Sequence, residues 1–122
     1  MGDRANVKIR NQNGSVFLYT HWDGSELPDK LQRALKRHQR WDDSAYLTRI
    51  IFCEMVRDDI DGETGFGIST NRTMDDRPIL IVDCSSQRVA VGDRADIEIR
   101  SVSFEEFCEM SDAELDRFVR RQ

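Results

Sequence analysis

Residues 5–22, ANVKIRNQNGSVFLYTHW, contain the clearest structural pattern of this chain. On both sides of Asn13-Gly14, apolar residues alternate with polar ones, which is the pattern of half-buried strands. Asn-Gly supplies the positive φ angles that a tight hairpin turn requires. The stretch therefore predicts two antiparallel strands over residues 5–11 and 15–22, joined at this turn.

The first strand has a near copy later in the chain. Residues 2–10, GDRANVKIR, resemble residues 92–100, GDRADIEIR, and both predict a polar turn that enters a strand. An antiparallel pairing would set Lys8 opposite Glu98, whereas a parallel pairing would set arginine against arginine. Because opposite charges favour a cross-strand pair by a few tenths to about 1 kcal/mol, we expect the two strands to be antiparallel neighbours. Chance resemblance between two short Arg-rich strands is the alternative.

The remaining residues predict two helices, four strands and two further helices. A helix follows Asp23-Gly24, with Ser25 as its cap and Pro28 in its first turn. A second helix is expected from Ser44 to about Asp58; it is apolar around most of its circumference, as in a central helix or a subunit interface. The four later strands are predicted at residues 65–70, 78–83, 87–91 and 95–102.

Two capping boxes mark the end of the chain. Ser103 with Glu106, and Ser111 with Glu114, each place a hydroxyl three residues before a glutamate and open two short helices. The order is then ββααββββαα. We expect an α+β fold: a single domain over residues 1–122, with an antiparallel sheet of about six strands and the helices packed on one face.

Composition limits the function. The chain has 122 residues, a formal charge of -5 and 34% charged residues, which argues against general nucleic-acid binding. The three cysteines, Cys53, Cys84 and Cys108, are widely spaced in apolar surroundings, as buried free thiols in a reducing cytoplasm are. With no long apolar run and no leader, a cytoplasmic protein without membrane contact is expected. Two histidines and no paired cysteines favour neither a metal nor a cofactor.

The densest group of functional residues lies at the end of the hairpin. Tyr19, His21 and Trp22 stand directly before a helix N-terminus, where free N–H groups attract anions and aromatic rings can stack on a planar group. Packing of an aromatic strand into the core is the alternative. We expect Tyr19, His21, Trp22 and Phe66 to form the aromatic wall of a ligand site, with Arg4, Arg72 and Arg94 as phosphate contacts.

A glycine-containing loop is the second candidate. Residues 58–70 contain several aspartates, but the spacing required by an EF-hand fails, and Gly65-Phe66-Gly67 lacks the third glycine of a dinucleotide fingerprint. Gly65 and Gly67 permit close approach of the backbone, either to a ligand or to a neighbouring strand.

Glu54 is the remaining candidate. At helical spacing it projects between Leu47, Ile50 and Ile51, so its carboxylate must find a cation or have its pKa raised. An arginine such as Arg57 would satisfy it structurally, whereas a raised pKa would suit a general acid or base.

Several blocks of the chain resemble a family of small uncharacterised proteins from bacteria and tailed phages. These blocks are GDRANV at residues 2–7, YTHWDGSELP at 19–28 and GETGFGIST at 62–70. The resemblance covers the first two-thirds of the chain and carries no established activity. It implies that the blocks surround one site and that the protein is of phage type, a class that includes anti-defence sponges sequestering host nucleotide signals.

These observations together predict a non-enzymatic homodimer or higher oligomer that encloses a small anionic, nucleotide-like ligand. No catalytic residue is assigned in this hypothesis. Two alternatives stay open: a small hydrolase that uses Glu54 or His21 as general base, and a protein-binding module that inhibits a host enzyme.

Overall fold

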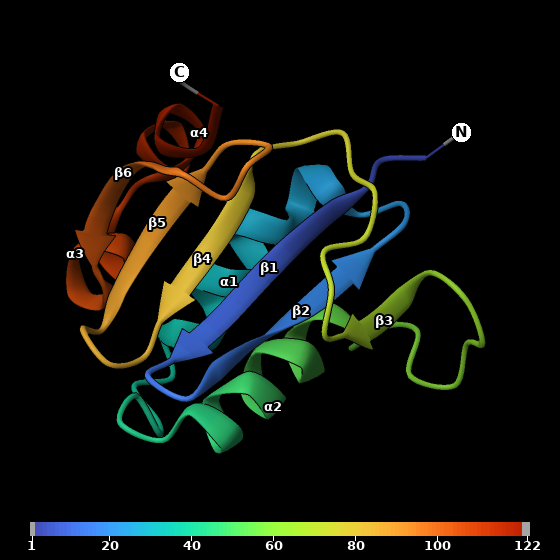
Figure 1. Ribbon diagram of the computed structural model, residues 1–122, viewed down its shortest axis with the longest axis horizontal. Coiled ribbons are helices and arrows are strands. Elements are labelled where there is room, and N and C mark those ends of the chain that lie inside the picture. The colour runs from blue at the N-terminus through green and yellow to red at the C-terminus, as the bar shows by residue number, and fades with distance from the viewer. Residues whose placement is uncertain (1, 121–122) are drawn as a thin grey trace.

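The computed structural model describes residues 2–120 and has the expected α+β architecture (Figure 1). Strand and helix order agrees with the prediction, with one short 3-10 helix, η1, added before α1. The elements are β1 (Ala5–Asn11), β2 (Gly14–Thr20), η1 (Gly24–Glu26), α1 (Leu27–Leu35), α2 (Ser44–Met55), β3 (Phe66–Ser69), β4 (Ile79–Asp83), β5 (Arg88–Gly92), β6 (Glu98–Ser103), α3 (Phe104–Glu109) and α4 (Asp112–Arg120).

The six strands form one sheet in the order β3-β2-β1-β4-β5-β6. The predicted hairpin forms, since β1 and β2 pair antiparallel from Ala5 opposite Thr20 to Asn11 opposite Gly14. Its turn is wrong by one residue: the chain turns at Gln12-Asn13, Gly14 already belongs to β2, and Asn13 does not have the positive φ that was expected. The sheet is mostly antiparallel but not wholly so, since β1 and β4 run parallel. β3 already runs in the same direction as β1, since both are antiparallel to β2. A long crossover, and not a hairpin, connects β3 to β4, so β4 keeps this direction and pairs parallel with β1.

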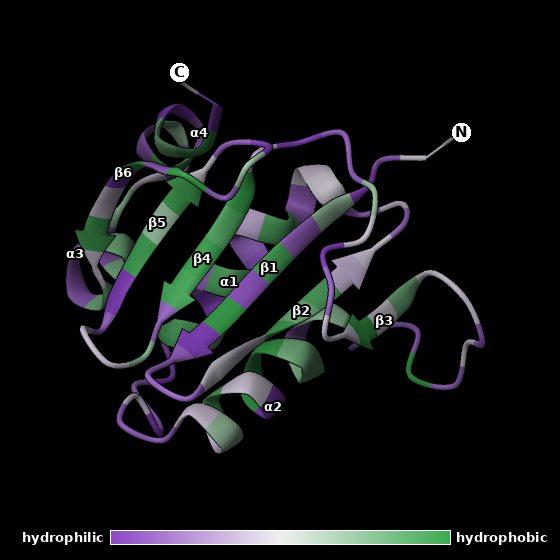
Figure 2. Cartoon of the chain, viewed as in Figure 1, coloured by the Kyte–Doolittle hydropathy of each residue, from purple (hydrophilic) through white to green (hydrophobic). Residues whose placement is uncertain are grey.

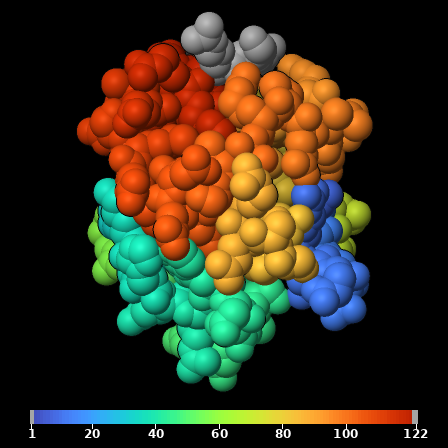
Figure 3. All heavy atoms as spheres, turned by 90° about the vertical axis from the view of Figure 1, so that its left-hand side faces the viewer, coloured from blue at the N-terminus to red at the C-terminus, as the bar shows by residue number. Residues whose placement is uncertain are grey.

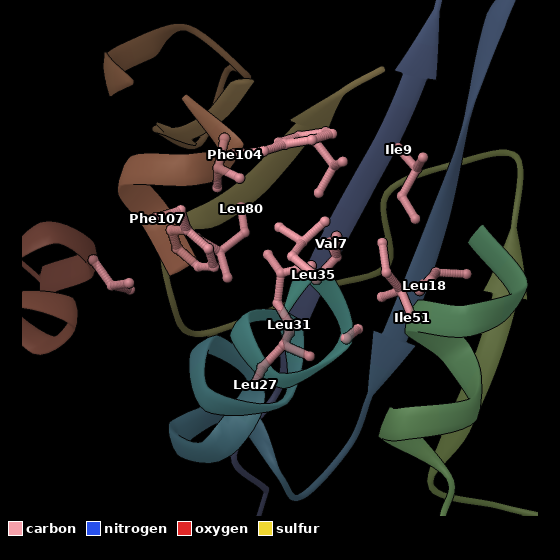
Figure 4. Close-up of a cluster of buried hydrophobic side chains, with 14 of the residues drawn as sticks. Val7, Ile9, Leu18, Leu27, Leu31, Leu35, Ile51, Leu80, Phe104 and Phe107 are labelled. Atoms are coloured by element: carbon pink, nitrogen blue, oxygen red, sulfur yellow. The ribbon is translucent and has the colours of Figure 1, made fainter. Parts of the chain in front are cut away.

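The helices cover one face of the sheet, as expected. Apolar side chains of all four α-helices join those of β1, β2, β4 and β5 in one buried cluster (Figure 4). In α1, Leu27, Leu31 and Leu35 recur every fourth residue, so they lie along one stripe that faces the sheet. Ser25 lies in η1 and does not cap α1, and α2 ends at Met55, earlier than expected.

The C-terminal helices begin where the capping boxes predict. Ser103 Oγ accepts from the Glu106 N–H at 3.0 Å, and the Glu106 carboxylate accepts from the Ser103 N–H at 2.9 Å. Ser111 and Glu114 repeat the exchange at the start of α4. Figure 3 shows the resulting C-terminal layer, orange to red, stacked beside the connection between α1 and α2.

Loops cover part of the opposite face of the sheet. The crossover from β3 to β4, residues 70–78, passes over β1, where Asn6 Nδ2 donates to the Thr73 carbonyl at 2.8 Å and to Asp75 at 2.7 Å. A small second core of Phe17, Ile79, Ile81 and Ala90 is buried on this face. We call it the outer face; it is the side toward the viewer in Figure 1.

The expected pairing of the two related strands is wrong. Both edges of β1 are occupied, by β2 and β4, and the β5–β6 hairpin places β6 at the far edge of the sheet. The repeated segments nevertheless meet through their side chains on the outer face. Lys8 lies 3.5 Å from Asp96, and Arg10 forms a salt bridge with Glu98. The charges are therefore complementary, but no ladder joins the strands.

Two expectations about burial are only partly met. Helix α2 is not central within the single chain, because Tyr46 is 52% exposed, whereas four of the five β4 residues are buried. Cys53, expected to be a buried thiol, is exposed on the same helix. Cys84 and Cys108 are buried free thiols as expected, and burial raises the pKa of Cys84 to about 11. Helix α2 is partly exposed because it lies over the edge of the sheet, and no other described element packs against its outer side.

Within residues 2–120, no helix has the length and apolar character to cross a bilayer.

Candidate functional site

The four predicted aromatic residues form a continuous chain of contacts at the end of β2. Ring centroids are 6.4 Å apart for Tyr19 and His21, 5.8 Å for His21 and Trp22, and 6.3 Å for Trp22 and Phe66, each pair edge to face. The Tyr19 hydroxyl lies 3.1 Å from His21 Nδ1, which fixes the imidazole relative to the phenol. The structure therefore brings these residues together; we call them the aromatic cluster.

Gly65 positions Trp22 within this cluster. A Cβ at Gly65 would lie 2.1 Å from Trp22 Cζ2, so the indole rests directly on the glycine backbone. The backbone N–H of His21 donates to the Gly65 carbonyl at 2.8 Å and aligns the two segments. Trp22 remains 46% exposed, so one part of its ring is open to solvent. A planar group could stack there without any rearrangement of the core.

Arg4 lies on the outer face beside His21 and Tyr19. Asn6 pairs with Tyr19 in the β1–β2 ladder, and the Asp3 N–H donates to the His21 carbonyl at 2.8 Å, so the pairing continues one step beyond each strand. Since alternate residues share a face, Arg4 and His21 project to the same side. Gly67, opposite Tyr19, adds no side chain to this surface.

The guanidinium of Arg4 is not neutralised within the described part of the chain. Its polar contact there is Met74 Sδ, 3.3 Å from Nη1, and it forms no salt bridge with any residue from 2 to 120. A thioether is a weak acceptor, so the charge and most donors of Arg4 remain available to an anion. This distinguishes Arg4 from most arginines of the outer face.

Most hydrogen-bond donors of Arg72 are paired within the protein. Its Nε donates to Asp75 at 3.0 Å, and its Nη1 donates to Asp96 at 2.7 Å and to the Asp93 carbonyl at 2.8 Å. These bonds tie the β3–β4 crossover to the β5–β6 loop. Arg72 therefore acts as a structural clamp and has few donors left for a phosphate.

Arg94 lies in a separate hollow of about 400 Å³ on the outer face. The hollow lies between the crossover and the β5–β6 loop, and the aromatic cluster contributes nothing to its lining. Arg94 is exposed, but Asp75, Asp76 and Asp93 share the lining with three arginines. The structure thus divides the predicted residues between the aromatic cluster with Arg4 and a hollow of balanced charge.

Asp3 and Arg77 form an ion pair between the aromatic cluster and the hollow around Arg94, and the sequence analysis did not identify it. Asp3 accepts from Arg77 through Oδ1 and from the Ser25 N–H at 2.9 Å through Oδ2. The hydrogen bond from Arg77 holds the pKa of Asp3 below its ordinary value. The sequence shows an acidic residue before β1 and a basic residue before β4. Their contact was not predictable, because only the parallel arrangement of these two strands brings them together.

Glu54 is buried and paired, as the structural interpretation predicts. Arg57 donates to its carboxylate at 2.6 Å and 3.3 Å, Arg37 adds a further short hydrogen bond, and Arg33 lies 3.7 Å away. Burial raises the pKa of Glu54, but the hydrogen bonds from Arg57 and Arg37 outweigh burial, so its pKa lies below the ordinary value. A carboxylate held ionised by arginines is a poor general acid or base.

Comparison with family models, with curated proteins and with solved structures finds no significant match. The resemblance to phage and bacterial proteins therefore stays a prediction. Within residues 2–120, no three His, Cys, Asp or Glu side chains are grouped to hold a metal ion. The chemistry available to the aromatic cluster and Arg4 is stacking, hydrogen bonding and charge neutralisation of an anion.

Proposed function

We propose that this protein binds a small anionic, nucleotide-like molecule on the outer face, at the end of β1 and β2. The observation that carries the proposal is the unneutralised guanidinium of Arg4 beside an exposed aromatic cluster. Trp22 would stack against the base, the nearly perpendicular ring of His21 would contact the edge of the base, and Arg4 would bind phosphate through charge-assisted hydrogen bonds. Every one of these side chains comes from a single chain, so binding requires no second subunit.

The proposed role is retention of the ligand without chemistry. Glu54 is held ionised by arginines, and the Nδ1 atom of His21 is engaged by the Tyr19 hydroxyl. These contacts favour the binding protein over the hydrolase. With the family resemblance, they support a sponge that sequesters a nucleotide signal of the host.

The first test identifies the natural ligand. The full chain is purified from the cells that produce it and denatured, and the released small molecules are analysed by mass spectrometry. A stoichiometric nucleotide is expected. A hydrolysed product would instead support the enzyme, and release of no small molecule would favour a protein partner.

The second test measures the contacts by calorimetry with a panel of linear and cyclic nucleotides. Arg4→Gln removes a charged donor and should weaken binding by about 10- to 150-fold, from roughly 1.5–3 kcal/mol. Trp22→Ala should weaken it comparably, because stacking is worth about 1–3 kcal/mol per base. Arg117→Gln, which removes an exposed charge on α4, is the matched control and should bind as the wild type does. Equal loss in Arg117→Gln, or no uptake by the wild type, would overturn the proposal.

A further inference from the structure

An apolar groove runs between α2 and β3, and it meets the proposed ligand site at Phe66, which lines the groove and also contacts Trp22. It has a volume of about 590 Å³, and its lining includes Phe52, Val56, Ile60 and Ile68. Ile60 is 76% exposed and Ile68 is 59% exposed, which is unusual for two large aliphatic side chains so close together. Figure 2 shows the apolar colour of α2 continuing to β3 at this edge of the sheet. We call this surface the α2–β3 groove.

The strand beside the groove has a free edge. β3 is the first strand of the sheet, and among residues 2–120 it pairs with β2 alone. Since the His21 N–H bonds to the Gly65 carbonyl, the alternation of an antiparallel ladder directs the backbone groups of Gly67 toward β2 as well. The N–H and C=O groups of Phe66 and Ile68 then point outward, where another strand can pair with them.

The two edges of the sheet differ in their protection against such pairing. β6, at the other edge, carries Glu98 and Arg100, and the β5–β6 register is interrupted at Val91/Gly92. Charges and bulges are the devices that prevent edge-to-edge association. β3 has the sequence FGIS, without charge, proline or interruption. The β3 edge is therefore the one suited to pair with another chain.

We propose that the protein forms a homodimer in which the β3 strands of two copies pair antiparallel about a two-fold axis at Gly67. Phe66 of each copy would then exchange hydrogen bonds with Ile68 of the other, and the two glycines would face each other at the axis. A Cβ at Gly67 would meet nothing within 4 Å, so this position is open to a second copy. The two sheets become one, and the paired α2–β3 grooves cover each other.

The charges at the groove are complementary under the same two-fold axis. Phe66 and Ile68 line the groove together with Phe52 and Val56, so the axis at Gly67 passes beside the last turn of α2. In the sequence, Arg49 precedes the last turn of α2 and Asp59 follows it. Both residues line the groove, and neither forms a salt bridge with any described residue, so the proposed two-fold operation would bring Arg49 of one copy toward Asp59 of the other. A self-complementary surface of this kind favours a second copy over an unrelated partner.

The test is sedimentation velocity of the full chain over a concentration series. The wild type should show a concentration-dependent shift from monomer to dimer. Ile68→Lys places a charge in the groove and should raise the dimer dissociation constant at least tenfold. Ile97→Lys is the matched control, because Ile97 is 62% exposed but lies near the β6 edge; it should dimerise as the wild type does. Circular dichroism of each variant confirms that it is folded.

A charge exchange tests the two-fold geometry itself. Arg49→Asp and Asp59→Arg should each weaken the dimer, and the double variant should recover most of the loss because it restores both pairs. The proposal is overturned if the wild type stays monomeric at every concentration, or if Ile97→Lys disrupts the dimer and Ile68→Lys does not. It is also overturned if the loss of dimerisation free energy in the double variant equals the sum of the losses in the two single variants. Arg4 and Trp22 do not line the groove, so Ile68→Lys should keep nucleotide binding through these two side chains. Calorimetry of this variant therefore distinguishes failure of the dimer from failure of the proposed function.

Discussion

Gly65 illustrates how one missing side chain sets the position of a ring. Its φ is +99°, in the region that favours glycine, and the Trp22 indole occupies the space of its absent Cβ. Gly65→Ala should therefore cost about 1–3 kcal/mol of unfolding free energy, from backbone strain and displacement of the ring. Urea denaturation measures the loss, and the fluorescence of Trp22 should shift as its ring is displaced.

Gly67, two residues later, is the matched control for this prediction. A Cβ there meets no atom within 4 Å, and no positive φ is required. Gly67→Ala should be neutral or nearly so for the stability of the monomer. Equal losses at Gly65 and Gly67 would mean that strand propensity, and not contact with Trp22, determines the cost.

Glu54 shows the same dependence on surroundings through its charge. Its side chain is 2% exposed, and Glu54→Gln leaves the arginines without an ionised partner, at a cost of about 1–3 kcal/mol. Because the folded-state pKa lies below the ordinary value of 4.5, the unfolded state takes up a proton first as the pH falls. The stabilisation is complete above pH 4.5 and is lost as the pH falls through the lower folded-state pKa.

Denaturation of wild type and Glu54→Gln at a series of pH values measures this contribution. The difference in unfolding free energy should be constant near neutral pH and should shrink in acid, since the amide introduced by Glu54→Gln has no proton to take up. A difference that stays unchanged at the lowest pH at which both proteins fold would show that shape, and not charge, is what Glu54 contributes.

At the scale of elements, α2 divides into a buried and an open side. Ile51 is fully buried in the main apolar cluster, beside Leu18 of β2 (Figure 4), whereas its neighbour Ile50 is half-buried. Ile51→Ala should cost about 2–5 kcal/mol, because the surrounding core cannot collapse into the cavity. Ile50→Ala should cost less than about 1.5 kcal/mol, since solvent already reaches part of that side chain. Urea denaturation of both variants decides; similar losses would place both sides of α2 in the core.

The elements that sequence predicts well are those set by neighbouring residues. The β1–β2 hairpin and the capping box at Ser103 require only local geometry, and both form, although the hairpin turns at Gln12-Asn13, one residue before the predicted position. Features that depend on distant residues were missed. Asn6 and Arg72 hold the crossover over the outer face through partners far along the chain, and no local pattern predicts a parallel β1–β4 pair.

The candidate site follows the same division. Tyr19, His21 and Trp22 are close in sequence, so their contact was predictable; Phe66 joins them because β3 pairs with β2. The separation of Arg72 from this cluster was not predictable, since it depends on where the crossover lies. Similarly, the apolar circumference of α2 predicts a covered helix, but the single chain covers only one side of it.

The whole molecule should unfold as one unit, because a single apolar cluster joins every α-helix to the sheet. Two tryptophans report on separate regions: Trp22 at the end of β2, and Trp41, whose ring lies 5.3 Å from Phe104. In Trp22→Phe and Trp41→Phe, urea transitions followed by fluorescence and by circular dichroism should coincide, with an m-value of about 1–3 kcal/mol/M. Each comparison is made within one variant, so destabilisation by the substitution does not affect it. Distinct midpoints for the remaining tryptophan and for the backbone signal would instead divide the chain into two cooperative parts. The C-terminal layer of α3 and α4 would then be the one to separate, since its strand contacts are with β5 and β6 at one end of the sheet.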